Sequence, residues 1–399
     1  MTRRSVVAVV LGLLAVTIGL AVATSGPHPV DRANDGAAAV DPSAAASRPL
    51  APPSPVPVPK HEVYGFVPYW EMDDAIAEHL ATTDLTTIGV FSITHRPNGA
   101  LATNQNGFRR ITGDVGRRII AQSHDRKARV ELVYTSFGLA KNDAFFTNDV
   151  ARERTIRELV ALVTDLGVDG IDVDVEQMSP ARIPAYAAFV SSLRAAVIAA
   201  NPDGQVSVAT TANQRGAAMA LAASLAGADR VFMMGYDYRV AGSEPGASAP
   251  LGRRDGSQKT LEHSLDFYRD AGVPPELTIL GLPLYGMVWP VDGPGIGAAA
   301  TGRGDVWVPR RNLATIDSPS ASPSYDRVED VQVLVVPDGD AWQAVYYDTP
   351  ESLTPKLEVA DRRGLAGAGF WAIGYERGLP AYTDLINSFR SGRLADVAP

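Results

Sequence analysis

The chain has 399 residues, of which 46% are hydrophobic and 20% are charged, and its formal net charge is -9 at pH 7. This negative balance, with no lysine- and arginine-rich run after residue 4, argues against a nucleic-acid partner. The absence of cysteine excludes disulfides, thiolate metal ligands and a cysteine nucleophile.

Residues 1–23 are predicted to be a signal peptide or an N-terminal membrane anchor. Arg3 and Arg4 precede an apolar run from Val6 to Ala23 that ends in small residues, a pattern typical of a cleaved export signal. The run is also nearly long enough to cross a bilayer, so an uncleaved tether stays open. Residues 24–60 are rich in proline and alanine and are expected to form a disordered linker. We therefore expect a secreted or cell-surface protein with a folded domain over 61–392 and a tail over 393–399.

Eight short apolar runs alternate with helical patterns along the folded domain. The predicted strands are Val63–Val67, Thr87–Ile93, Arg129–Tyr134, Val168–Val175, Val206–Thr210, Arg230–Gly235, Thr278–Leu284 and Gly367–Ile373. The predicted helices are Asp74–Ala81, Val115–Asp125, Thr155–Leu166, Ile183–Ala200, Ala217–Ala226, Leu261–Ala271 and Glu351–Arg363. This rhythm predicts an α/β fold, a (β/α)8 TIM barrel, rather than an open doubly wound sheet.

One stretch interrupts the alternation between the seventh and eighth strands. Residues 286–347 contain no long helical pattern, but two short alternating runs, Val331–Val336 and Trp342–Tyr347, flank a turn sequence. We expect a small insertion that contains a hairpin.

The fourth strand carries the densest group of acidic residues. With the two-residue period of a strand, Asp172, Asp174 and Glu176 lie on one face, while Ile171, Val173 and Val175 lie on the other. Flanking helices predict a parallel sheet, whose strands are buried on both faces, so the acidic face is expected to be buried as well. Three interpretations stay open at this point: a solvated acidic edge, a catalytic acid cluster, and a divalent-cation site.

Aromatic and polar residues recur where the other predicted strands end. Because a TIM barrel places its chemistry at the carboxyl ends of its strands, these residues are expected to share one rim. Rings beside acids suit a sugar, whose C–H face stacks on a ring while its hydroxyls form hydrogen bonds. The strand-end residues are Tyr69, Trp70, Asn213, Tyr236, Asp237, Tyr285 and Trp371. The six histidines show no metal-ligand spacing, so no metal site is predicted from them.

The motifs resemble those of glycoside hydrolase family 18, the chitinases and related glucosaminidases. Residues 169–176 match its Asp-Gly-x-Asp-x-Asp-x-Glu signature, and residues 234–237, 281–286 and 369–371 resemble its sixth-, seventh- and eighth-strand motifs. The insertion looks most like the bacterial branch that includes spore-cortex and peptidoglycan glucosaminidases. The resemblance implies an enzyme without cofactor or metal.

The same resemblance implies roles for individual residues. Glu176 would be the general acid, Asp174 would orient the substrate's 2-acetamido group with Asp172 behind it, and Tyr236 would hydrogen-bond the acetamido carbonyl. Asp237 would contact the substrate nearby, and Trp371 would form the floor under the reacting sugar. The residues expected to line further subsites are Tyr69, Trp70, Asn213, Tyr285 and Trp289.

We therefore expect a monomeric glycosidase that cleaves β-linked N-acetylglucosaminides, in chitin oligomers or in peptidoglycan glycan strands, with retention of configuration. The alternative from another class is a catalytically silent carbohydrate-binding protein on the same fold. Intact Glu176 and Asp174 argue against that alternative.

Overall fold

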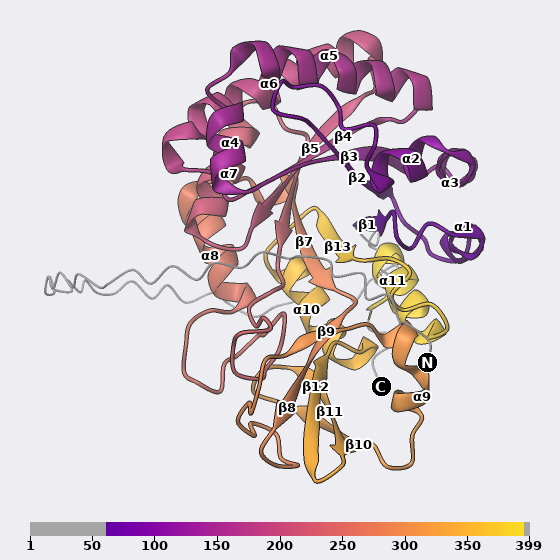
Figure 1. The fold of residues 1–399 in the computed structure, drawn as a ribbon, viewed down its shortest axis with the longest axis vertical. Helices are drawn as coiled ribbons and strands as arrows, with labels where there is room; N and C mark the ends of the chain where they lie inside the picture. The colour runs from indigo at the N-terminus through magenta and orange to yellow at the C-terminus, as the bar shows by residue number, and fades with distance from the viewer. Residues whose placement is uncertain (1–60, 395–399) are drawn as a thin grey trace, which may run out of the picture. The chain divides into compact units, whose positions relative to one another are not determined.

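A computed structural model describes residues 61–394. The predicted segments 1–23 and 24–60, and residues 395–399 of the predicted tail, lie outside the described residues. Eight parallel strands close into a barrel in the order β1-β13-β7-β6-β5-β4-β3-β2 (Figure 1). Their bounds are β1 Glu62–Pro68, β2 Thr87–Thr94, β3 Arg129–Phe137, β4 Gly170–Glu176, β5 Gln205–Thr211, β6 Arg230–Met234, β7 Thr278–Pro283 and β13 Gly367–Trp371. The prediction of a TIM barrel is confirmed.

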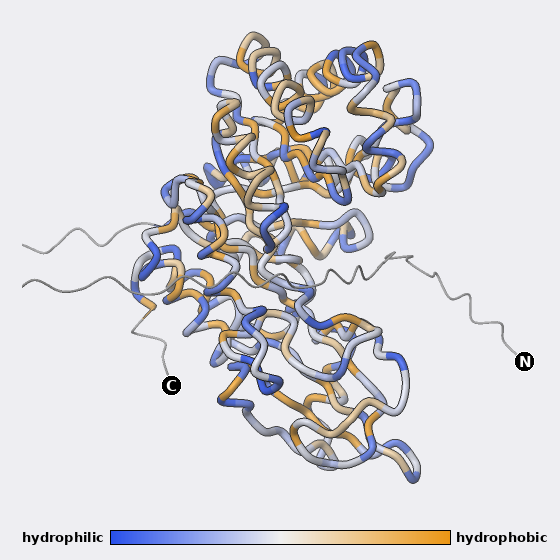
Figure 2. Tube along the Cα trace, turned by 90° about the vertical axis from the view of Figure 1, so that its left-hand side faces the viewer, coloured by the Kyte–Doolittle hydropathy of each residue, from blue (hydrophilic) through white to orange (hydrophobic). Residues whose placement is uncertain are grey.

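Helices surround the barrel on its outside (Figure 1). They are α1 Asp74–Leu80, α2 Asn106–Thr112, α3 Asp114–Asp125, α4 Leu139–Phe145, α5 Asp149–Leu166, α6 Ile183–Ala200, α7 Gln214–Leu225, α8 Leu261–Ala271, α10 Pro350–Arg362 and α11 Pro380–Ser391. A further short helix, α9 Leu313–Ile316, belongs to the insertion between the seventh and eighth barrel strands. The apolar face of each main helix packs on the outward face of the strands, which forms one continuous core. Hydrophobic residues accordingly follow the inner segments of the trace, and hydrophilic ones mark its surface turns (Figure 2).

The ends of α5 explain how β4 is positioned. Asn148 caps the helix by accepting a hydrogen bond from the Ala151 N–H at 3.0 Å, and Gly167 ends it with a φ of 67°, a left-handed conformation that favours glycine. The helix therefore begins earlier than the predicted Thr155, because the capping asparagine precedes a polar first turn. Short helices α2 and α4 were not predicted, since two turns carry too little apolar periodicity.

The insertion is a five-stranded antiparallel sheet in the order β10-β11-β12-β8-β9. Its strands are β8 Gly286–Val291, β9 Asp305–Trp307, β10 Ser322–Asp326, β11 Val331–Asp338 and β12 Ala341–Tyr347. The predicted hairpin corresponds to β11 and β12, which pair antiparallel. The expectation of a hairpin is confirmed, and the sheet around it is larger than predicted because β8, β9 and β10 are short and lack a clear alternation.

The Phe232 ring fills the middle of the barrel between two glycines. A Cβ at Gly281 would lie 2.4 Å from the ring, and a Cβ at Gly369 would lie 2.5 Å from it. Both positions therefore require a residue without a side chain. Tyr64 and Phe66 pack on the same ring, so aromatic side chains fill this part of the barrel interior.

Candidate active site

The acidic face of β4 points into the barrel. Asp172 is fully buried and Asp174 is 6% exposed, whereas Glu176, the last residue of the strand, is half-buried. The opposite face, with Ile171, Val173 and Val175, belongs to the core under the helices. The interpretation of β4 as a solvated acidic edge is therefore wrong, because closure of the barrel removes any exposed sheet face.

The buried carboxyls of β4 have few protein partners. Within residues 61–394, neither Asp172 oxygen nor the Oδ1 atom of Asp174 forms a hydrogen bond. Burial raises the pKa of Asp172 well above its usual range, and the nearby charge of Glu131 raises it further. Burial and the charges of Glu176 and Asp172 likewise raise the pKa of Asp174. Because neighbouring carboxyls in a dry site cannot all be ionised, the cluster retains protons at neutral pH.

Glu176 has the property that a proton donor needs near neutral pH. Burial raises its pKa to about 7, and the negative charge of Asp237 adds to the effect. A carboxylic acid that is protonated up to this pH can give its proton to a leaving group.

A buried asparagine, Asn142 of α4, fixes the chain at the end of β4. Its side-chain amide donates to the carbonyl of Ser136 at 3.0 Å and to the carbonyl of Glu176. Gln177 follows with a φ of 61°, so the backbone turns sharply behind the acid. Asn142 was not predicted as a site residue, because it lies in a helix too short to be recognised.

Tyr236, Asp237 and Tyr285 form a second polar group at the ends of β6 and β7. Tyr285 donates a hydrogen bond from its hydroxyl to the Asp237 carboxylate, and the backbone N–H of Asp237 donates to Ser248 Oγ at 3.1 Å. Asp237 has a φ of 62°, a conformation that aspartate tolerates better than most residues. Burial raises the pKa of Tyr236, and the charges of Asp174, Asp237 and Glu176 raise it further. The predicted tyrosine and the acids of β4 therefore belong to one site.

Three predicted aromatic residues meet at the ends of β1 and β13. The Trp70 ring lies 4.9 Å from Tyr69 and 6.3 Å from Trp371, measured between ring centroids. Trp70 is 37% exposed, and its Nε1 atom donates to the Tyr375 hydroxyl at 3.1 Å. Trp371 also packs edge-on against Phe91 at 4.7 Å. This arrangement leaves apolar ring surface at the same end of the barrel as Glu176.

Two predicted subsite residues have other roles. Trp289 is fully buried in the core of the insertion, so the prediction that its indole lines a subsite is wrong. Its ring is covered by Tyr346 and by Gly304, where an added Cβ would lie 2.5 Å from Nε1. Asn213 caps α7: its side-chain oxygen accepts hydrogen bonds from the N–H groups of Arg215 and Gly216, each at 3.0 Å. Its contact with substrate stays a prediction.

Phe137 and Glu131 of β3 were missed as candidate site residues. Phe137 is 44% exposed and lies directly opposite Glu176 in the register of β3 and β4. Glu131 is buried inside the barrel and accepts a hydrogen bond from the Tyr64 hydroxyl. The sequence offered one signal for each of them. Glu131 is a single carboxylate among the apolar residues of β3, and Phe137 is a phenylalanine at the end of that strand.

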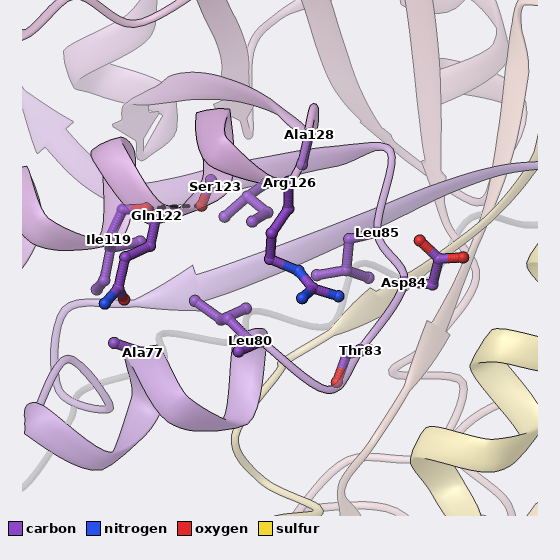
Figure 3. A pocket seen from close by; sticks show the side chains of 12 residues that line it. Ala77, Leu80, Thr83, Asp84, Leu85, Ile119, Gln122, Ser123, Arg126 and Ala128 are labelled. Carbon is purple, nitrogen blue, oxygen red and sulfur yellow. Dashed lines mark hydrogen bonds between the residues drawn. The ribbon is translucent and has the colours of Figure 1, made fainter.

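Two cavities lie at the opposite, N-terminal end of the strands. The first, about 20 Å³ in volume, is lined by aliphatic residues of α1 and α3 together with Arg126 and Asp84 (Figure 3). It has room for little more than one water molecule. The second, about 480 Å³, is lined by His124, Lys127 and Arg390, among others. Neither cavity contains any of the predicted catalytic residues.

No group of three histidine, aspartate or glutamate side chains within residues 61–394 is arranged to hold a metal ion. The acids of β4 project from one strand, and their neighbours are tyrosines and further carboxyls rather than a converging set of ligands.

A family model for "Glycosyl hydrolases family 18" matches residues 65–376 of the chain. The chain belongs to this family. The matched region begins in β1 and ends just after β13, so it covers the barrel and the insertion.

Relatives of this family-18 protein include bacterial and plant proteins. The class V chitinase CHIT5 of Lotus japonicus is 31% identical over 162 residues, which cover 36% of this chain and 37% of that protein. YdhD of Bacillus subtilis is 24% identical over 296 residues, 72% of this chain and 66% of YdhD. The glycosylase YvbX of the same species is 24% identical over 315 residues, covering 74% and 86%. The chain thus spans less than two thirds of the length of CHIT5 and YdhD.

Solved structures share the fold of this family-18 domain. The Ostrinia furnacalis Group IV chitinase in complex with allosamidin has a TM-score of 0.72 at 19% identity, covering 85% of this chain and all of that one (100%). The Bacillus cereus spore cortex-lytic enzyme SleL has a TM-score of 0.64 at 18% identity, covering 82% and 74%. At these identities the likeness establishes the fold alone.

Proposed function

We propose that the protein hydrolyses β-linked N-acetylglucosaminides, with Glu176 as the general acid. One observation carries this proposal: a half-buried carboxyl with a pKa of about 7 ends the strand that also holds the buried Asp174. Such a pair can keep one proton for the leaving group and one negative charge for the developing cation.

The proposed reaction uses the substrate's own acetamido group as nucleophile. The acetamido oxygen forms a bond to C1 while the glycosidic C1–O bond breaks, and Glu176 gives its proton to the departing oxygen. Asp174 holds the acetamido N–H and stabilises the oxazolinium-like cation, and Tyr236 donates to the acetamido oxygen. Water then attacks C1 from the face that the leaving group vacated, and Glu176 takes back a proton. Two inversions at C1 give retention of configuration.

Rings at the rim suit the apolar face of a sugar. Trp371 packs between Phe66 and Phe91, which fixes the plane of its indole. Trp70 and Phe137 add exposed ring surface at the ends of β1 and β3. We assign Trp371 to the floor of the reacting sugar and the two exposed rings to neighbouring sugars.

The comparisons support a substrate built from N-acetylglucosamine. Related solved structures include a Cycas revoluta chitinase in complex with (GlcNAc)3. SleL is named as a spore cortex-lytic enzyme. We therefore propose chitin oligomers and peptidoglycan glycan strands as the two substrate classes, acted on outside the cell.

Reading the first residues of the mature protein would test export: a start after residue 23 is expected for a cleaved signal, and an intact N-terminus would favour the tether.

The test compares the full chain with Glu176→Gln on a chitooligosaccharide and on purified peptidoglycan. We expect shortened products from the wild type, with the β-anomer formed first, and none from the variant. A wild type that binds the sugars without cleaving either would favour the silent binding protein. A first product in the α configuration would contradict the acetamido-assisted mechanism.

A further inference from the structure

Glu131 is a buried carboxylate that the proposed mechanism does not use. It lies in the middle of β3 and is 1% exposed. Both of its oxygens accept hydrogen bonds: one from the Tyr64 hydroxyl at 2.8 Å, the other from Ser207 Oγ at 2.9 Å. A carboxyl held in this way inside an apolar barrel needs a functional or structural reason.

The register of the strands places Glu131 directly below Asp172. Glu131 pairs with Gly170 of β4, and Asp172 pairs with Ser207 of β5. The Glu131 carboxyl reaches across β4 to the Ser207 hydroxyl on β5. Its carboxyl therefore lies in the layer beneath the acids of β4, on the side away from the substrate.

The hydrogen bonds decide which of the two carboxyls carries a negative charge. Two hydroxyl donors stabilise an ionised Glu131, whereas neither oxygen of Asp172 has a donor within the described part of the chain. Two carboxyls at close range in a dry site hold at least one proton between them. That proton is therefore more stable on Asp172 than on Glu131.

The surrounding charges favour the same distribution. The charged and titratable groups that act on Glu131 are Tyr64, Arg129, Asp172, Asp229 and Arg230, two of them cations. The groups that interact electrostatically with Asp172 are Glu131, Tyr64, Asp174, Tyr186 and Tyr236, and none of them is a cation. Burial raises the pKa of Glu131 to about 7, so its charge is fully present only in alkaline solution.

We propose that Glu131 is a positioning residue: it holds a negative charge beneath Asp172 and keeps Asp172 protonated, so that the negative charge of the β4 acids stays on Asp174. This inference rests on the proposed function for its effect on turnover, but the placement of the proton does not depend on activity. Glu131 does not contact the substrate and acts through Asp172.

Glu131→Gln tests the proposal, because glutamine keeps the shape and removes the charge. Without that charge Asp172 loses its proton at lower pH, so the pH at which Asp172 titrates should move down by about one to two pH units. KM for a chitooligosaccharide should stay within about twofold, since the substrate contacts are intact. A purely structural role would change stability and leave the titration of Asp172 where it is in the wild type.

Infrared difference spectroscopy separates this proposal from the proposed function. At pH 8 the wild type should show the band of a protonated carboxyl that Asp172→Asn removes and Glu131→Gln weakens, whether or not the protein cleaves sugars. Ser207→Ala is the matched variant, because it removes one donor but keeps the charge and should shift the band less. A wild type without this band would overturn the proposal. A Glu131→Gln protein whose band has unchanged intensity and unchanged pH dependence would overturn it as well. If Glu131→Gln does not fold, Tyr64→Phe replaces it. Loss of the Tyr64 donor makes Glu131 more basic, so the shared proton should shift from Asp172 to Glu131 and the Asp172 band should weaken.

Discussion

Removing the Glu176 carboxyl should stabilise the protein above neutral pH while it lowers kcat by orders of magnitude. Glutamate has an ordinary pKa of 4.5, and burial beside Asp237 raises the pKa of Glu176 to about 7 in the folded chain. The folded state therefore binds the proton more tightly than the unfolded state does. Stability from this group is fully present below pH 4.5 and is lost as the pH rises to 7.

The size of this effect follows from the pKa difference of about 2.5 pH units. At about 1.4 kcal/mol for each pH unit, the ionised Glu176 costs the folded state at most about 3.5 kcal/mol above pH 7. Glu176 is half-buried, so solvent screening reduces this figure to about 2 kcal/mol. For a domain of about 330 residues, that free energy corresponds to a Tm change of about 3 °C.

The assay is thermal unfolding of wild type and Glu176→Gln at pH 4.5 and pH 8. We expect the variant to melt about 3 °C higher than the wild type at pH 8. At pH 4.5 the two melting temperatures should agree within about 1 °C, because both side chains are then uncharged in the folded state. Glu78→Gln is the control, because Glu78 is an exposed acid on α1 and its loss should have the same small effect at both pH values. Equal Tm differences at the two pH values, or a less stable variant at pH 8, would refute the electrostatic argument.

Three further predictions concern the barrel and the acid cluster. Asp174→Asn should lower kcat on a chitooligosaccharide by about 10²-fold or more, because the amide cannot balance the charge of the oxazolinium-like cation; an unchanged kcat would remove Asp174 from the mechanism. Gly369→Ala should lower the free energy of urea unfolding by about 1–3 kcal/mol, since its Cβ would lie 2.5 Å from the Phe232 ring. Gly242→Ala, which has open space around it, is the matched control, and equal losses in both variants would contradict the packing argument. Treatment with EDTA should leave hydrolysis unchanged, and activity lost to EDTA and restored by a divalent cation would revive the cation-site interpretation.

The periodicity of the sequence predicted those strands whose own residue pattern matches the burial that the folded barrel gives to their two faces. In β4 the alternation of acids and aliphatic residues is a local property, and closure of the barrel buries both faces without changing it. The strands of the barrel could be predicted for the same reason, since each is a short apolar run between helices with recognisable ends.

The site residues that were missed or misplaced depend on contacts between distant segments. Trp289 lies in β8, whose side chains point alternately to two faces, and the face it occupies belongs to one buried cluster with Ala247, from a loop that precedes it by about forty residues. Sequence alternation distinguishes two faces of a strand but does not say which one another segment covers. The role of Glu131 likewise depends on Ser207, from a strand that is not adjacent to β3 in the barrel.

Glu176 as proton donor is the central claim, and a paired measurement of turnover and binding tests it most directly. For Glu176→Gln on a chitooligosaccharide we predict a kcat about 10²- to 10⁴-fold below that of the wild type, with Kd for the same sugar within about threefold. A variant that keeps the wild-type kcat would contradict the account.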